Sequence, residues 1–319
     1  MHITRFSVFA AALGLVAALS AAAPSARGAS APAAAYAISD STTGFLLEGQ
    51  NQHKKLQIGS LTKIATAMVV LDWSESQHQE MSEQATVPQS AEPLNTSGNG
   101  VGFHAGDRCS LKDLMYAALM QSDNQAAETL ADHVGHALGS GQQAPVTFFV
   151  AQMNALARRL GMRDTRFLNP HGLEGLEKSL PYSTAEDLAL LTRYAMQNPA
   201  FVFYVSQKER RITYYAGGGT EASNYLLRNT NELLGVENID GVKTGTTRNA
   251  GQCVIVSAAH APDSRQQGEQ VIISPRRLNV VVLGAADRFN LARQLLARGW
   301  HLYDEWATAG RPTKGWKPK

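Results

Sequence analysis

The chain is poor in cysteine, which excludes a fold held together by a disulfide framework. Only two of its 319 residues are cysteines, Cys109 and Cys253, and they form no motif with each other. They could pair in an oxidising compartment, but Cys253 lies in an apolar, strand-like run, which favours a buried free thiol. A chain of this length can bury a full core without such staples.

An excess of charge of one sign is also absent once the first residues are set aside. Of the 29 basic residues, Arg5 and Arg27 lie before residue 28, and the 27 that remain equal the 27 acidic ones. A near-neutral domain lacks the electrostatic footprint of nucleic-acid binding, so no nucleic-acid partner is expected.

Long apolar runs are absent except for one at the N-terminus, from Phe6 to Leu19, which is too short to span a membrane. It follows His2 and Arg5 and precedes the small-residue pattern Ala21-Ala22-Ala23, so it predicts a secretory signal peptide over residues 1–28, cleaved near 23–28. No cysteine follows the run, so a lipoprotein anchor is not expected. No second apolar stretch approaches membrane-spanning length, so a transmembrane anchor is not expected either.

Helical and strand-like patterns are grouped along the chain, with no internal repeat and no long linker, which predicts an α+β fold with an antiparallel sheet. A hairpin is expected around Asp40–Thr43, and Ser183-Thr-Ala-Glu186 resembles a capping box for the helix that follows. Helices are expected over residues 60–71, 114–120, 124–138, 146–160, 185–197 and 288–305. Strand-like runs cover residues 211–215, 239–243, 251–260 and 277–284. Residues 311–319 are expected to form a frayed, solvated end.

Ser60 and Lys63 lie three residues apart at the start of an apolar helix, and therefore one turn apart on the same side. At a helix N-terminus, free backbone N–H groups and the helix dipole favour negative charge developing on Ser60. Burial lowers the pKa of an amine, so a neutral Lys63 could take the serine proton. This pattern alone is weak, because a chain of this length contains roughly one Ser-x-x-Lys by chance.

Two further motifs follow it along the chain. Ser122-Asp123-Asn124 lies between two helical patterns, where a hydroxyl can relay a proton and an amide can hold a peptide group, although an N-cap is the simpler reading of this motif alone. Lys243-Thr244-Gly245 ends a strand-like run, where a cation can meet a carboxylate and a glycine lets a peptide approach an edge strand.

The three motifs in this order resemble the signature of penicillin-binding proteins and class A β-lactamases. The chain is most similar to the low-molecular-mass penicillin-binding proteins, the D-alanyl-D-alanine carboxypeptidase and endopeptidase family. Segments Asn169–Leu173, Tyr182–Leu188 and Arg228–Asn231 carry further similarity. The resemblance implies a β-lactamase/transpeptidase-like α+β fold, in which an antiparallel sheet packs with helices and a helical subdomain, and the active site lies between them. It covers a DD-peptidase catalytic domain at residues 35–306, followed by a short polar and basic tail at 307–319.

Carried over residue by residue, the resemblance makes Ser60 the acyl-ester nucleophile, Lys63 the proton acceptor and Ser122 a proton relay. Substrate would be held by Asn124, Lys243, Thr244, Gly245 and Thr246. The backbone N–H groups of Ser60 and Thr246 would form the oxyanion hole. The expected partners are peptidoglycan stem peptides, with β-lactams as covalent inhibitors, in the periplasm. No metal or cofactor is expected.

The sequence leaves the cleaved bond open between a carboxypeptidase and an endopeptidase. Many carboxypeptidases of the family have Ser-Gly-Asn as the middle motif, a further β-rich domain and an amphipathic anchor. This chain has Ser122-Asp123-Asn124, and the residues after Trp306 are too few for either addition, which favours a soluble periplasmic form like the endopeptidases.

Three other interpretations of the function remain. A class A β-lactamase needs a glutamate base between the second and third motifs, and Glu174 and Glu177 lie there. A penicillin-sensing or peptidoglycan-binding module without catalysis would not need the intact serine and lysines. A metal site at His133 and His136, one helical turn apart, lacks a clear third ligand.

Overall fold

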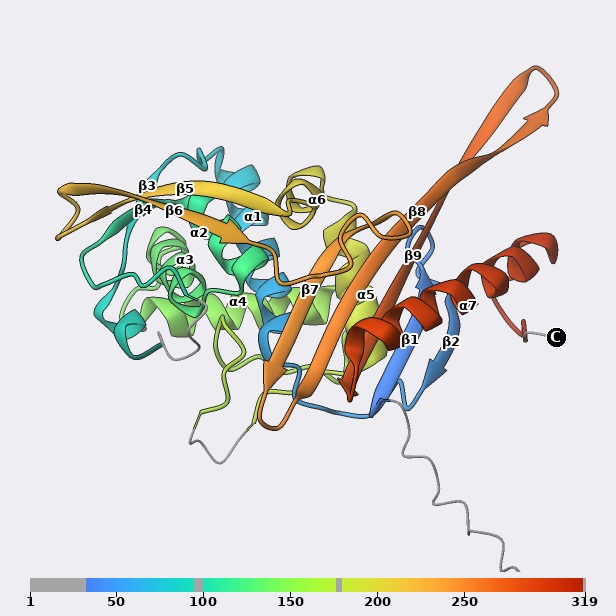
Figure 1. Cartoon of the computed structure of the whole chain (residues 1–319), viewed down its shortest axis with the longest axis horizontal. Helices are drawn as coiled ribbons and strands as arrows, with labels where there is room; N and C mark the ends of the chain where they lie inside the picture. The colour runs from blue at the N-terminus through green and yellow to red at the C-terminus, as the bar shows by residue number, and fades with distance from the viewer. Residues whose placement is uncertain (1–32, 95–99, 176–179, 318–319) are drawn as a thin grey trace, which may run out of the picture. The chain divides into compact units, whose positions relative to one another are not determined.

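Two antiparallel sheets packed with helices make up the part of the chain that the computed structural model describes, residues 33–94, 100–175 and 180–317 (Figure 1). The expected signal peptide lies outside these residues. The larger sheet has the strand order β2-β1-β9-β8-β7, with β1 (Ala35–Asp40), β2 (Leu46–Gln50), β7 (Ile239–Thr247), β8 (Gly251–Gln267) and β9 (Gln270–Ala285). The smaller sheet has the order β3-β4-β5-β6, with β3 (Gln84–Thr86), β4 (Arg108–Ser110), β5 (Glu209–Ala216) and β6 (Glu221–Arg228). The α+β prediction is confirmed.

The helices lie between the sheets and on the outer face of the larger one (Figure 1). They are α1 (Lys63–Gln77), α2 (Leu111–Tyr116), α3 (Asn124–Ala137), α4 (Pro145–Arg159), α5 (Ala185–Met196), α6 (Pro199–Val205) and α7 (Arg288–Thr308). Three short turns join them: the 3-10 turns η1 (Gly59–Thr62) and η2 (Gln89–Leu94), and the π-helical turn η3 (Ala117–Gln121). Within the described residues, none of the helices is both long and apolar enough to cross a membrane.

The larger sheet is buried on both faces, which explains why its strands read as continuous apolar runs. In β9, Val281 and Leu283 belong to the core shared with α1 and α5, whereas Val280 and Val282 face the core under α7. This alternation follows from the two-residue period of a strand.

Helix α1 passes through the middle of the core, and its first turn differs from the prediction. Ten of its residues are buried, which accounts for its lack of a polar face. It begins at Lys63, and Ser60 lies in the 3-10 turn η1 that leads into it.

The start of α5 also differs by one residue. Thr184 is the N-cap, with its hydroxyl accepting from the Asp187 N–H at 3.1 Å. Ser183 is extended instead, because its backbone exchanges two hydrogen bonds with Leu56, at 2.9 and 3.0 Å.

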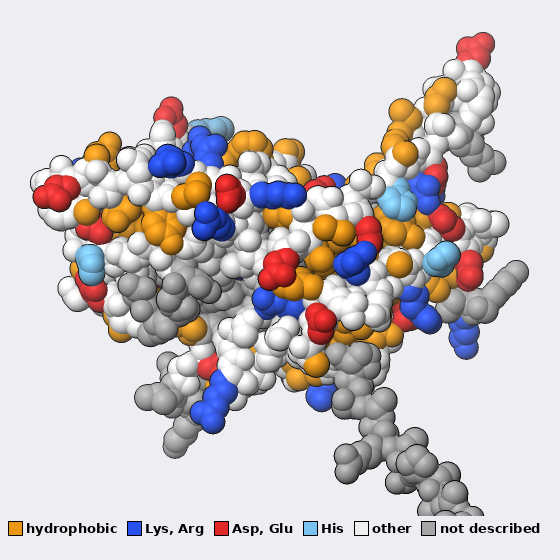
Figure 2. All heavy atoms as spheres, in the orientation of Figure 1, with side chains coloured by type: hydrophobic (Ala, Val, Ile, Leu, Met, Phe, Trp, Pro, Cys, Tyr) orange, Lys and Arg blue, Asp and Glu red, His pale blue; other side chains and the backbone are white. Residues whose placement is uncertain are grey.

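Strands β8 and β9 are longer than predicted and continue past the sheet as a two-stranded ribbon, visible at the upper right of Figure 1. Hydrophobic side chains lie along this ribbon in Figure 2. Among them Val271, Ile272 and Ile273 are 58%, 44% and 65% exposed. Strand β6 was also not predicted, because most of its side chains are polar or exposed.

The segment after α7 is attached rather than frayed. The Trp306 indole donates to the Pro312 carbonyl at 3.0 Å, and the Trp316 ring meets the Phe45 ring edge-on with centroids 6.2 Å apart. Arg311 donates to Asp263 at 2.7 Å. These contacts cover the apolar end of α7 and correct the expectation of a solvated end, although Lys314 and Lys317 are exposed.

Candidate active site

Ser60 lies where the turn η1 meets strand β7. Two glycines allow this contact: a Cβ on Gly245 would come within 2.7 Å of the Ile58 carbonyl oxygen, and one on Gly59 would lie 3.3 Å from the Thr246 nitrogen. Gly59 also has a φ of +52°, which favours glycine. The close approach brings the Ser60 side chain beside the third motif, which is far away in the sequence.

Lys63 is fully buried and has three polar neighbours. Its Nζ lies 3.0 Å from Ser60 Oγ, 2.7 Å from Asn124 Oδ1 and 2.9 Å from the His171 carbonyl oxygen. Burial lowers the pKa of Lys63 to about 7, although the charge of Asp123 opposes this shift. Near neutral pH a large fraction of Lys63 is therefore an uncharged amine.

The three neighbours fit an uncharged amine. Such an amine has two N–H donors and one lone pair. The amide oxygen of Asn124 and the carbonyl oxygen of His171 can only accept hydrogen bonds, whereas the Ser60 hydroxyl can donate one. The lone pair of a neutral Lys63 thus faces the serine proton, as a general base requires.

The second motif divides its residues between structure and cleft. Asp123 is buried and is the N-cap of α3, accepting from Ala126 N–H at 2.8 Å and from Val101 N–H at 2.7 Å. Ser122 has a φ of +67° at the end of η3, and both Ser122 and Asn124 line the cleft. The capping interpretation is confirmed for Asp123, whereas the roles of Ser122 and Asn124 in the cleft stay predictions.

The residues of the third motif also differ in whether they reach the cleft. Thr244, Gly245 and Thr246 line the cleft, but Lys243 is 1% exposed and lies beneath it, with its Nζ donating to the Thr244 carbonyl at 3.0 Å. Burial, together with the charges of Lys63 and Arg288, lowers the pKa of Lys243 well below its usual value. The expected cation for a carboxylate is thus not at the surface of the cleft.

Arg288, which the sequence analysis missed, supplies a cation there. It is the first residue of α7, and its Nη1 donates to Thr246 Oγ1 at 2.7 Å and to the Gly245 carbonyl at 3.1 Å. Burial lowers its pKa, but an arginine stays charged at any physiological pH. No motif marks Arg288, because only the pairing of β7, β8 and β9 brings the start of α7 beside Thr246.

His171 is a second residue with a larger role than its sequence suggested. Its carbonyl accepts from Lys63, and its imidazole is buried with Nδ1 accepting from the Leu173 N–H at 3.1 Å. Its Nε2 lies 4.0 Å from Glu128 Oε2. Burial lowers the pKa of His171 to about 3, so the ring stays neutral and holds the loop that carries the carbonyl.

The cleft has a volume of about 140 Å³, and none of the described residues that line it is an aspartate or glutamate. Glu174, the candidate base of a β-lactamase, accepts from the Thr247 hydroxyl and from Asn249 Nδ2, the latter at 2.6 Å. Glu177 lies outside the described residues.

His133 and His136, the candidate metal ligands, each lie near a carboxylate. His133 lies 3.4 Å from Glu83, and His136 lies 4.0 Å from Asp132. Among residues 33–94, 100–175 and 180–317, no group of three or more His, Cys, Asp or Glu side chains is arranged to hold a metal. Cys109 and Cys253 are both buried free thiols.

Known proteins are similar to this chain in sequence and fold. Residues 20–274 match the family described as D-alanyl-D-alanine carboxypeptidase. The chain is 32% identical to the D-alanyl-D-alanine carboxypeptidase DacC of Escherichia coli over 86% of this chain and 63% of that protein. It is 31% identical to a D-alanyl-D-alanine endopeptidase of Pseudomonas aeruginosa over 79% of this chain and 71% of that protein.

A solved structure agrees with these matches. Penicillin-Binding Protein D2 from Listeria monocytogenes, in its ampicillin-bound form, superposes with a TM-score of 0.65 and 28% identity, over 84% of this chain and 98% of that one. The chain spans less than two thirds of the length of the DacC and DacD carboxypeptidases that it matches, between 62% and 63%.

Proposed function

Since the chain belongs to the D-alanyl-D-alanine carboxypeptidase family, we propose that it is a serine peptidase that cleaves peptidoglycan stem peptides through an ester on Ser60. The observation that carries the proposal is the set of contacts of Lys63: one hydroxyl that can donate and two oxygens that can only accept, around an amine with a pKa lowered to about 7. This arrangement suits a lysine that removes the serine proton.

The first half of the reaction forms the ester. Neutral Lys63 takes the Ser60 proton as Oγ attacks the carbonyl carbon of the penultimate D-alanine. The oxyanion that forms accepts hydrogen bonds from the backbone N–H groups of Ser60 and Thr246. The proton that Lys63 took is relayed through the Ser122 hydroxyl to the departing amine as the C–N bond breaks, and Asn124 holds the peptide on the acyl side. A water molecule then cleaves the ester and restores the Ser60 hydroxyl.

The substrate carboxylate is assigned to Thr244, Thr246 and Arg288. Arg288 is the cation that borders the cleft, and its contact with Thr246 Oγ1 supports this role. Lys243 supports the strand from beneath the cleft, where its Nζ donates to the Thr244 carbonyl, and Gly245 lets the substrate backbone approach β7.

The proposal extends to location and domain limits. Residues 1–28 would be a signal peptide that directs the chain to the periplasm, residues 35–306 the catalytic domain, and residues 307–319 a tail. β-Lactams would acylate Ser60 in place of the peptide, in keeping with the ampicillin-bound relative.

The test is to incubate the exported form of the protein with a stem pentapeptide and with a cross-linked muropeptide dimer, and to identify products by mass. Loss of the terminal D-alanine identifies a carboxypeptidase, and conversion of the dimer to monomers an endopeptidase. Ser60→Ala should abolish cleavage and labelling by fluorescent penicillin, whereas Ser264→Ala, on the exposed ribbon, should change neither. Labelling that survives in Ser60→Ala would refute the choice of nucleophile. Rapid turnover of nitrocefin would instead identify a β-lactamase.

A further inference from the structure

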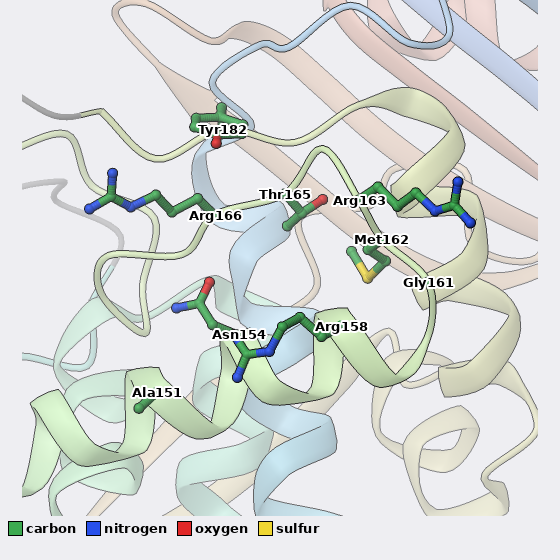
Figure 3. Close-up of a pocket in the computed structure, with 9 residues that line it drawn as sticks. All are labelled: Ala151, Asn154, Arg158, Gly161, Met162, Arg163, Thr165, Arg166 and Tyr182. Carbon is green, nitrogen blue, oxygen red and sulfur yellow. The ribbon is translucent and has the colours of Figure 1, made fainter.

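A second cavity, of about 750 Å³, lies outside the active site (Figure 3). The C-terminal half of α4, the loop that follows it and Tyr182 form its walls. Nine residues line it, and three of them are arginines: Arg158, Arg163 and Arg166. None of the nine is acidic.

The three guanidinium groups have no ion-pair partner among the described residues. Of the acidic side chains nearby, Asp72 pairs with Arg159 at 2.7 Å and Asp164 pairs with Lys55 at 3.0 Å. Asp187 accepts hydrogen bonds from the Thr165 hydroxyl and the Asp164 N–H, at 2.7 and 2.9 Å. The formal net charge of the whole chain is only +2, so three unpaired cations at one cavity form a local concentration of positive charge. Such a site attracts anions.

The cavity presents these cations on two sides. In Figure 3, Arg158 and Arg166 extend toward one side and Arg163 toward the other. The remaining polar groups are engaged in structure: Asn154 exchanges two hydrogen bonds with Phe167, at 2.9 and 3.0 Å, and Thr165 donates to Asp187 at 2.7 Å. The cavity therefore suits a ligand with more than one anionic group, because planar guanidinium groups bind carboxylates by paired hydrogen bonds.

The cavity is joined to the active site by short stretches of chain. Arg166 and Leu173, which lines the catalytic cleft, are ends of one loop that spans at most about 25 Å when fully extended. On the other side, Tyr182 adjoins Ser183, whose backbone pairs with Leu56, close to Ser60 in the sequence. The Cα atoms of Arg166 and Leu173 therefore lie at most about 25 Å apart, and this separation is taken to be within reach of a neighbouring repeat of a polymer bound at Ser60.

We propose that this cavity is a second recognition site for peptidoglycan, at which Arg158, Arg163 and Arg166 bind free carboxylates of a stem peptide other than the one at Ser60. This inference rests on the proposed function, because it takes the substrate to be a polymer whose repeats carry carboxylates. It assigns the cavity a role in preferring polymeric or cross-linked peptidoglycan over free peptides.

The test compares the kcat/KM of a double variant and of a control variant on two substrates, a free stem peptide and peptidoglycan. The double variant Arg158→Gln/Arg166→Gln should retain the wild-type kcat/KM on a free stem peptide and lose about tenfold on peptidoglycan at low salt, as expected for removing two charge-assisted contacts. The loss should shrink in 0.5 M NaCl, where exposed charges are screened. Arg108→Gln/Arg211→Gln, which removes two exposed arginines outside the cavity, should behave like wild type on both substrates.

Equal losses on both substrates, or none on peptidoglycan, would overturn the inference. These outcomes differ from a failure of the proposed function, in which the wild type itself would cleave neither substrate. Binding adds a readout that needs no cleavage: the Ser60→Ala variant should bind a muropeptide dimer more weakly when the two glutamine substitutions are added, and unchanged binding would also refute the site.

Discussion

Asn124→Asp is the sharpest test of the assignment of Lys63 as the base, because it adds a charge 2.7 Å from Nζ with almost no change in shape. At that distance two unit charges attract by about 6 kcal/mol at an effective dielectric constant of about 20. Desolvation of the new carboxylate cancels part of this energy. Opposite charges this close shift a pKa by about 1–3 units in proteins.

The direction of the effect follows from the protonation states. A nearby carboxylate stabilises the ammonium form and so raises the pKa of Lys63 from its value of about 7. Only the neutral amine accepts the Ser60 proton. The midpoint of the pH dependence of the acylation rate should therefore shift to a pH that is higher by about 1–3 units. At pH 7, acylation should fall by about fivefold or more, because the neutral fraction of Lys63 falls by that factor when the pKa rises by one unit.

The assay is the second-order rate of acylation by fluorescent penicillin, measured from pH 5 to pH 10. In the wild type, the acylation rate should rise with pH around a midpoint near 7. Asn290→Asp, on the exposed side of α7, makes the same chemical change away from Lys63 and should leave that midpoint in place. A midpoint in Asn124→Asp that equals the wild-type value would refute Lys63 as the titrating base, even if the overall rate falls through weaker substrate binding.

Two further predictions concern the folded state. Gly172→Ala should lower the free energy of unfolding in urea by about 3 kcal/mol or more, because the new Cβ would lie 2.0 Å from a backbone oxygen at a φ of +84°. Gly139→Ala is the control, since Gly139 has a φ of +81° and open space around it. This substitution should lower the free energy of unfolding by only about 1 kcal/mol. Equal losses of stability in the two variants would show that the backbone moves to relieve the contact between the new Cβ and the backbone oxygen. Cys109 and Cys253 are buried free thiols, and burial raises the pKa of both. A thiol reagent at pH 8 should therefore modify neither cysteine in the native protein and both in denaturant. Rapid labelling of the native protein would contradict their burial.

The sequence predicted which residues meet at the cleft better than it predicted their individual surroundings. The spacing of Ser60 and Lys63 indicated their contact, because residues three apart on a helical turn are neighbours. The position of Lys243 below the cleft could not be anticipated, since a strand pattern shows which residues alternate but not which face meets a cavity. Arg288 was missed for a similar reason, because its place depends on strand order.

The parts of the fold that sequence patterns missed are those stabilised by few apolar contacts. Strand β6 carries mostly exposed side chains, so its sequence lacks the alternation that marks a half-buried strand. The ribbon formed by β8 and β9 contains Pro262 and Pro275, residues that usually argue against a strand. The contact of Trp316 with Phe45 is a tertiary interaction that no local pattern reports.

The glycine contacts around Ser60 also bear on when the proposed active site can form during folding. Gly172 and Gly245 press against the backbone of the Ile58–Gly59 segment from two regions that are far away along the chain. Contacts between distant segments form late, because closing long loops costs entropy before any packing is gained. In an incompletely folded chain Lys63 would therefore be solvated and charged, and the Thr246 N–H would be absent from the oxyanion hole, so the serine would become reactive only when tertiary assembly is complete.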